Sequence, residues 1–196
     1  SAENYRNVTK WLSQTNHTER IPLLFRQAFY QLRTGKGGPV LLEVPLNVSK
    51  AEFEGELEYT SVTGNRTAPD EGEVKEIAQV LLDADSPVIH AGQGCLYAET
   101  WSELQEIAEL LQAPVLTTLP GKSAFPEDHP LALGASAVST TLQTAHFLDK
   151  ADVIFGIGCS LTRTNYGPKI PSGKRIIHST NDPNDVNKDH VADHSR

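Results

Sequence analysis

Short apolar segments alternate with amphipathic ones through the second half of the chain, and this alternation constrains the fold more than any other sequence feature. The strands predicted around these segments are residues 87–91, 114–118, 153–157 and 175–179. The third shows no polar alternation, as expected for a strand buried on both faces. Segments with helical spacing of apolar residues separate them, and strands alternating with helices indicate a doubly wound parallel α/β sheet with right-handed crossovers.

The first helix of this region has clear start and face signals. Asp70 is a good N-cap residue, and Glu73 follows three positions later in a capping-box arrangement. Further helices are predicted over residues 101–111 and, from a weaker pattern, over residues 140–148. One apolar stripe predicts the buried face of the first helix, formed by Val74, Ile77, Ala78, Leu81 and Leu82.

A helix and a strand precede this region. Pro22 suits the first turn of a helix that ends near Gly35, and residues 40–44 form an apolar strand ended by Pro45. Residues 1–18 carry little pattern, so the strand has no evident earlier partner. The pair is therefore interpreted as the end of something larger.

Three parts follow from these patterns. Residues 1–46 are expected to be a domain remnant, residues 47–69 a linker with a solvated acidic face, and residues 70–196 an α/β domain. The last strand of that domain is expected beyond residue 196. The absence of Met from the whole chain suggests processing or trimming.

Composition excludes several function classes. The net charge of −8, with no offsetting cluster of Lys or Arg, argues against a nucleic-acid binder. No apolar run approaches the roughly 20 residues that a membrane helix needs, and the polar start is unlike a signal peptide. Cys95 and Cys159 are the only cysteines. We expect both to be reduced packing residues of a cytoplasmic protein.

Three glycine-containing loops follow predicted strands, where ligands of open parallel sheets bind. Neither G-x-G is a dinucleotide fingerprint, because Tyr97 and Leu161 occupy the third glycine position. A P-loop is excluded because Leu116 stands where its first glycine is required. The loops are Gly92-Gln93-Gly94, Leu119-Pro120-Gly121-Lys122 and Gly156-Ile157-Gly158.

The seven histidines form no evident site. His190 and His194 have a spacing that metal ligands use, but a frayed terminal segment is the expected structure there. His90 lies in an apolar strand and is expected to be a hydrogen-bonded core histidine. No G-x-S-x-G elbow occurs, so a serine hydrolase has no support.

Five phrases, in this order and spacing over residues 20–190, resemble thiamine-diphosphate-dependent enzymes of the acetolactate synthase and 2-hydroxyacyl-CoA lyase group. The most specific lies within the third phrase and the start of the fourth. The phrases are Gly37-Gly38-Pro39-Val40-Leu41-Leu42-Glu43-Val44-Pro45, Pro87-Val88-Ile89-His90-Ala91-Gly92-Gln93-Gly94, Pro114-Val115-Leu116-Thr117-Thr118-Leu119-Pro120-Gly121-Lys122-Ser123-Ala124-Phe125-Pro126, Asp128-His129-Pro130-Leu131-Ala132-Leu133-Gly134 and Asn181-Asp182-Pro183-Asn184-Asp185-Val186-Asn187-Lys188.

The resemblance implies a pyrimidine-binding domain, a Rossmann-like central domain and a diphosphate-binding domain. Residues 1–46 would then end the first, and residues 70–196 would form most of the second. The G-D-G…N signature for diphosphate and Mg²⁺ does not occur, and the activating glutamate would lie upstream of Ser1. The whole protein would be a homodimeric or homotetrameric lyase or carboligase acting on 2-oxo acids. This chain alone would be inactive, because carbanion chemistry belongs to a cofactor held between the other two domains.

The resemblance implies different uses of the central domain within this group. It looks like an FAD site in acetolactate synthases, an ADP site in oxalyl-CoA decarboxylases, and only a spacer in other members. Departures from the acetolactate synthase pattern after Gly158 and Gly134 favour ADP over FAD. The alternative from another class is a free-standing α/β nucleotide-binding or interaction module. The candidate nucleotide cradle, in which glycine N–H groups would meet phosphate oxygens and Asn181 and Asp182 would approach the ribose, consists of Gly92, Gln93, Gly94, Gly121, Lys122, Gly158, Cys159, Ser160, Asn181 and Asp182.

Overall fold

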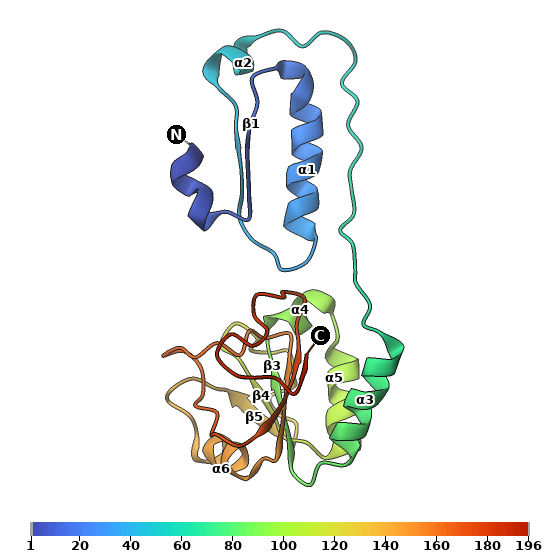
Figure 1. The fold of residues 1–196 in the computed structure, drawn as a ribbon, viewed down its shortest axis with the longest axis vertical. Helices are drawn as coiled ribbons and strands as arrows, with labels where there is room; N and C mark the ends of the chain where they lie inside the picture. The colour runs from blue at the N-terminus through green and yellow to red at the C-terminus, as the bar shows by residue number, and fades with distance from the viewer. Residues whose placement is uncertain (1, 196) are drawn as a thin grey trace. The chain divides into compact units, whose positions relative to one another are not determined.

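Two units make up the fold, Ser1–Ala68 and Pro69–Arg196. The computed structural model, shown as a ribbon in Figure 1, describes residues 2–195. The first unit contains the elements η1 (Ala2–Val8), β1 (Trp11–Gln14), η2 (Thr18–Arg20), α1 (Ile21–Arg33), β2 (Val40–Glu43) and α2 (Leu46–Lys50). Within this unit, residues 51–68 contain no helix or strand.

The strand β2 has an earlier partner, contrary to the sequence expectation. β1 pairs with it in parallel, and Leu12 lies opposite Leu41. The helix α1 is therefore the crossover of a β–α–β unit. β1 escaped prediction because its sequence, Trp-Leu-Ser-Gln, is short and shows no apolar run.

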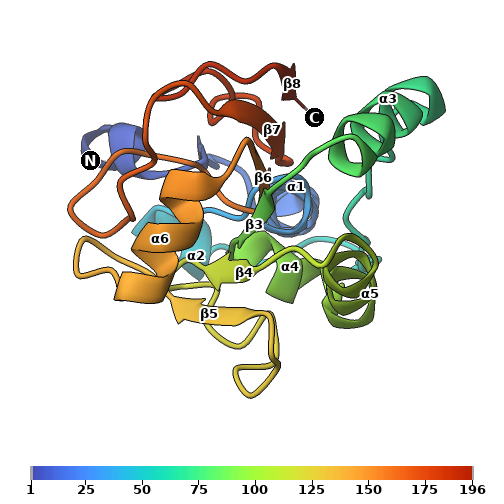
Figure 2. The same ribbon diagram turned by 90° about the horizontal axis from the view of Figure 1, so that it is seen from below.

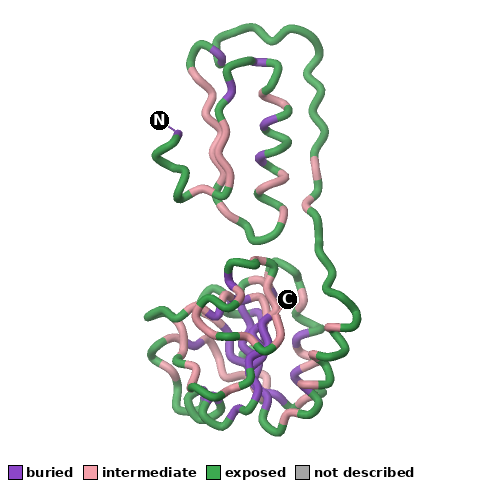
Figure 3. The backbone as a smooth tube through the Cα atoms, viewed as in Figure 1, coloured by how far each residue is buried: buried purple, intermediate pink, exposed green. Residues whose placement is uncertain are grey.

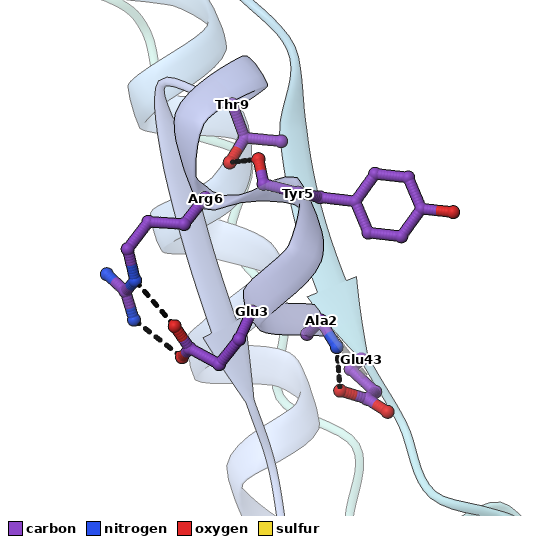
Figure 4. Close-up of polar contacts among 6 residues, drawn as sticks. All are labelled: Ala2, Glu3, Tyr5, Arg6, Thr9 and Glu43. Atoms are coloured by element: carbon purple, nitrogen blue, oxygen red, sulfur yellow. Dashed lines mark hydrogen bonds and ion pairs between the residues drawn. The ribbon is translucent and has the colours of Figure 1, made fainter.

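A hydrogen bond joins the N-terminal helix η1 to β2 (Figure 4). The Ala2 N–H donates to the Glu43 carboxylate at 3.2 Å. Arg6 and Glu3 form a two-bonded ion pair within η1, with both N–O distances 2.7 Å. Both side chains of that pair are exposed, so the link to Glu43 matters more for holding η1 in place.

The helix α1 follows the predicted pattern. Pro22 lies in its first turn, and Leu24 and Ala28 are buried. After the helix, Gly35 adopts a φ of 61°, a left-handed conformation that suits glycine at a helix end. The Lys10 ammonium donates to carbonyl oxygens at this same end, including that of Gln31 at 2.7 Å, where a positive charge complements the helix dipole.

The second unit is built around one sheet whose strand pairs are all parallel. The strand order is β5-β4-β3-β6-β7-β8. This confirms the predicted doubly wound α/β fold. Its elements are α3 (Glu71–Leu82), β3 (Pro87–Ala91), α4 (Gln93–Ala98), α5 (Trp101–Leu111), β4 (Val115–Thr117), β5 (Ala132–Ala135), α6 (Leu142–Lys150), β6 (Val153–Ile157), β7 (Arg175–Ser179) and β8 (His194–Ser195).

Helices cover both faces of this sheet (Figure 2). α3 and α5 pack on one face, where Leu81 and Leu104 join a cluster with Ile89. α6 packs on the other face, where Leu148 joins Val88 and Ile154. Burial is concentrated in the central strands of this sheet, as Figure 3 shows. Within the described residues, no helix has the length and apolar character needed to cross a membrane.

Three elements of this unit were not predicted: α4, β5 and β8. The strand β8 adds His194–Ser195 to the sheet beside β7, in the segment that was expected to be frayed. The prediction of a frayed segment around His190 and His194 is therefore wrong. The Asp193 N–H donates to the Ile176 carbonyl, and the Asp193 carboxylate accepts from the Ile176 N–H, both at 2.8 Å. These bonds hold the segment against β7.

Candidate ligand site at the carboxyl edge of the sheet

The strand order reverses at β3, whose neighbours are β4 and β6. In open parallel sheets the crevice beside such a reversal, at the carboxyl ends of the strands, is where ligands bind. The turn after β3 contains Gly92 and leads into α4, whose first turn contains Gly94, and the turn after β6 contains Gly158. The predicted candidate residues on these two turns therefore come together.

The two turns are packed directly against each other. A Cβ atom built on Gly92 would lie 2.2 Å from the Gly158 carbonyl oxygen and 2.5 Å from the Cys159 Cα. A Cβ on Gly94 would lie 2.7 Å from the Gly158 Cα, and one on Gly121 would lie 2.8 Å from the Gly92 carbonyl carbon. Close backbone packing alone therefore requires glycine at these positions.

The amide groups of these glycines already have protein partners. The Gly92 N–H donates to the Ile157 carbonyl and the Gly94 N–H to the Gly158 carbonyl, each at 2.8 Å. The Gly158 N–H donates to the Ser179 carbonyl at 2.9 Å, and the Gly121 N–H to the Thr118 carbonyl at 3.0 Å. In this conformation, these four donors are directed to the protein rather than toward a phosphate.

The polar side chains of the candidate set also have local partners. The Lys122 ammonium pairs with the Glu127 carboxylate. The Ser160 hydroxyl accepts a hydrogen bond from the Thr162 hydroxyl at 2.9 Å. The Asp182 carboxylate accepts from the Asn184 N–H at 3.0 Å. Asn181 follows β7 and is exposed, as is Gln93 at the start of α4.

The two cysteines line these turns as buried, free thiols. The Cys159 thiol donates to the His90 carbonyl at 3.4 Å, and the Cys95 thiol to the Ile157 carbonyl at 3.5 Å. Burial raises the pKa of the Cys159 thiol to about 12 and raises that of Cys95 as well. Both thiols are therefore protonated at neutral pH and lack nucleophilic character, as expected for packing residues.

His90 departs from its expected role as a hydrogen-bonded core histidine. Its side chain is buried within β3, but neither ring nitrogen has a hydrogen-bond partner among the described residues. Burial, together with repulsion from His178 and His190, lowers the pKa of His90 to about 4. The sequence places His90 in a strand. The residues that neighbouring strands place beside His90 cannot be predicted from the sequence around it.

Two hydroxyl groups at the same edge were not singled out from the sequence. Thr117, at the end of β4, and Ser136, just after β5, are buried, and their hydroxyl oxygens lack a hydrogen-bond partner among the described residues. His190 and His194 form no metal site, since no group of three His, Cys, Asp or Glu side chains within residues 2–195 is arranged to hold a metal ion.

Comparisons with known proteins agree with this architecture. The sequence pattern of the family described as "Thiamine pyrophosphate enzyme, central domain" matches residues 74–195. A solved structure of benzoylformate decarboxylase from Polynucleobacter necessarius is 29% identical and superposes with a TM-score of 0.79, covering 95% of this chain and 35% of that one.

Curated relatives match along almost the whole chain. The "Probable acetolactate synthase large subunit" of Methanocaldococcus jannaschii is 35% identical over 95% of this chain and 33% of its own length. The "Glyoxylate carboligase" of Escherichia coli O157:H7 is 32% identical over 92% of this chain and 31% of its own length. The chain therefore spans about a third of the length of the curated relatives it matches.

Proposed function

The chain belongs to the thiamine pyrophosphate enzymes, whose central domain it contains, and from that premise we propose that the whole protein is a thiamine-diphosphate- and Mg²⁺-dependent lyase or carboligase. Its substrates are 2-oxo acids, and it works as a homodimer or homotetramer in the cytoplasm. Residues 70–196 serve this enzyme as a central scaffold. The residues that act on the substrate lie in the rest of the protein.

One observation carries this proposal. The similarity to an acetolactate synthase and to a glyoxylate carboligase extends over at least 92% of the chain, so it includes the first unit, which lies outside the family match at 74–195. A central domain recruited alone into an unrelated protein would not keep that preceding unit. This favours an enzyme with the domain order of its relatives over a free-standing α/β module.

The residues present do not fit a complete site for thiamine diphosphate. The sequence lacks the G-D-G…N signature that would hold the diphosphate and Mg²⁺. Within the described residues, no group of acidic, histidine or cysteine side chains is arranged for a metal ion. When bound, thiamine diphosphate supplies the carbanion chemistry, and protein groups hold and orient it. We place those groups in the domains that this chain does not contain.

The first unit supports this assignment. Its parallel pair β1–β2 is joined through α1, yet parallel sheets in proteins are ordinarily larger and covered on both faces. Phe25 and Phe29 of α1 stack on each other with 43% and 37% of their surfaces exposed. We propose that residues 1–46 are the end of a pyrimidine-binding domain, that 47–69 link the two domains, and that preceding residues of the whole protein complete the first sheet.

A second candidate function is an adenine-nucleotide site in the central domain, as in an oxalyl-CoA decarboxylase-like or 2-hydroxyacyl-CoA lyase-like enzyme. The convergence of the turns after β3 and β6 at the strand reversal favours it. The engaged amides of Gly92, Gly94, Gly121 and Gly158 weigh against it and leave scaffolding as the first candidate. FAD fits less well than ADP, because Cys159-Ser160 follow Gly158 in this chain. The acetolactate synthase pattern has an arginine in this segment.

Turnover by the whole protein tests the proposal. Purified enzyme would be incubated with thiamine diphosphate and Mg²⁺ and offered pyruvate or glyoxylate, while carbon dioxide release and products with a new carbon–carbon bond are measured. We expect turnover that requires the cofactor, and none from residues 1–196 alone. Cofactor-dependent turnover by this chain alone would contradict the scaffold assignment. A whole protein inactive on every 2-oxo acid would contradict the enzyme class.

A further inference from the structure

Residues 51–68 differ along their length in how they lie against the rest of the first unit. They contain no helix or strand, and in Figure 1 the chain runs beside α1 before it reaches α3. Residues 51–61 are exposed, whereas Val62 and Gly64 are partly buried and alternate with exposed neighbours. Alternation with a period of two is typical of an extended chain that lies with one side against a surface.

Two side-chain hydrogen bonds join this stretch to the C-terminal half of α1. The Arg33 guanidinium donates from Nη1 to the Val62 carbonyl at 2.5 Å. The Asn65 side-chain amide donates to the Tyr30 hydroxyl at 2.9 Å. The Arg33 guanidinium also lies over the Phe29 ring, 5.5 Å from its centroid, which helps to orient it. The stretch from Val62 to Asn65 is therefore attached to α1 at both of its ends.

Gly64 lies between the two bonds and is in direct contact with the backbone of the helix. A Cβ atom built on Gly64 would lie 2.1 Å from the Arg33 carbonyl oxygen and 2.7 Å from the Arg33 carbonyl carbon. The backbone of Gly64 is outside the left-handed region, so the requirement for glycine comes from this close approach alone. Any side chain at this position would lift the stretch away from α1.

These contacts determine how much unattached chain lies between the two units. The helix α2 ends at Lys50, and Asp70 caps α3. If all of residues 51–69 were unattached, they could span about 65 Å when extended. With residues 62–65 held on α1, only residues 66–69 remain, and these span about 14 Å at most. The contacts therefore limit the reach between the units without setting their orientation.

We propose that residues 62–65 form a clip on α1, which keeps the tether between the two units short when closed and releases all of residues 51–69 when open. The bonds of the clip are exposed to water, so each favours the closed form only about threefold, and the two together about tenfold. Segments held this weakly open and close under native conditions. The clip does not depend on which reaction the whole protein catalyses, and its test requires no turnover.

Cleavage by trypsin after Arg66 measures the opening of the clip. Arg66 is exposed and directly follows the clip, and a protease binds several extended residues on both sides of the bond that it cuts. Because cleavage follows the population of the open form when opening is fast, the bond should be cut about tenfold more slowly in the whole protein than in a peptide of residues 58–74. Mass spectrometry of timed samples would give both rates.

Three variants distinguish the clip from other effects on cleavage, each compared with a peptide that carries the same change within residues 58–74. Gly64→Ala should accelerate the cut after Arg66 about tenfold, and Tyr30→Phe, which removes the acceptor for Asn65, about threefold. Thr63→Ala alters an exposed residue of the same stretch and should leave the rate unchanged. The double variant of Gly64→Ala and Tyr30→Phe should be cut no faster than Gly64→Ala, because an open clip has no bond left to lose.

A glutamate-specific protease provides the internal reference. Glu58 lies outside the clip in exposed chain, so the cut after it should be equally fast in every variant. If Gly64→Ala does not fold, Tyr30→Phe and the comparison of the unaltered protein with the peptide still decide. Equal cutting after Arg66 in protein and peptide, equal rates in Gly64→Ala and Thr63→Ala, multiplying effects in the double variant, or parallel acceleration after Glu58 would overturn the proposal.

Discussion

Replacement of Gly92 by alanine should destabilise the second unit strongly, although alanine suits the local backbone. Gly92 has a φ of −108°, which any residue adopts, so no conformational strain is expected. The added Cβ would lie 2.2 Å from the Gly158 carbonyl oxygen, about 1 Å inside ordinary contact, and 2.5 Å from two atoms of Cys159. These are backbone or near-backbone atoms, so rotation of a side chain cannot relieve the overlap.

The size of the effect follows from what must move. Overpacking of a well-packed core costs about 1–3 kcal/mol. Separation of the two turns would also weaken the bonds from Gly92 to Ile157 and from Gly94 to Gly158, each contributing about 1 kcal/mol. We expect Gly92→Ala to lower the free energy of unfolding by about 3–5 kcal/mol, which corresponds to a fall in Tm of about 10–20 °C for a unit of this size.

Chemical and thermal denaturation followed by circular dichroism would measure this change. Gly167→Ala is the matched control, because a Cβ at Gly167 would meet no atom closer than 3.6 Å and its backbone lies outside the left-handed region. We expect that variant to change stability by less than about 0.5 kcal/mol, as surface substitutions usually do. A Gly92→Ala variant as stable as Gly167→Ala would refute the packing argument.

Three further predictions concern a loop-bridging carboxylate, the linker and the ligand. Asp152→Asn should lower the free energy of unfolding by about 1–2 kcal/mol, because the Asp152 carboxylate accepts hydrogen bonds from the Asp85 and Ser86 N–H groups at 2.8 and 2.9 Å. Urea denaturation would measure this, and an unchanged midpoint would refute it. Burial raises the pKa of Asp152, but the hydrogen bonds from backbone N–H groups outweigh burial, so the pKa is lower than that of an ordinary aspartate. The stability that the Asp152 carboxylate contributes is therefore complete above about pH 4 and is lost as the pH falls through the lowered pKa. A glutamate-specific protease should cut first within residues 51–58, an exposed stretch without helix or strand, and mass spectrometry would show an early cut inside the central sheet if this is wrong. In thermal denaturation, ADP at about 1 mM should raise stability by roughly 2.7 kcal/mol if a site with a Kd near 10 μM exists, while FAD should give no shift; a shift with FAD alone would contradict the order of preference.

The sequence by itself determined the elements whose signals are local. The runs 87–91, 153–157 and 175–179 became strands with the predicted limits, because each has consecutive apolar residues that are buried in the middle of a sheet. The Asp70 cap also formed as predicted, with its carboxylate accepting the Gly72 and Glu73 N–H groups. These features depend on residues within a few positions of one another.

Only the tertiary structure decided the features that depend on distant partners. β1 and β8 are short and mixed in sequence, so their strand character comes from pairing with β2 and β7 rather than from their own pattern. The role of Gly92 was decided in the same way. Glycine after a strand is consistent both with a phosphate cradle and with tight backbone packing, and the approach of Gly158, far along the chain, supplies the packing partner.

His90 shows the same limit for a side chain. Its position in an apolar strand was enough to predict burial, because the neighbouring residues are apolar. Whether a buried imidazole finds a hydrogen-bond partner depends on the residues that other strands place beside it. Gly156 and His178 reach that row through a sheet register formed across more than sixty residues of chain, which no local pattern encodes.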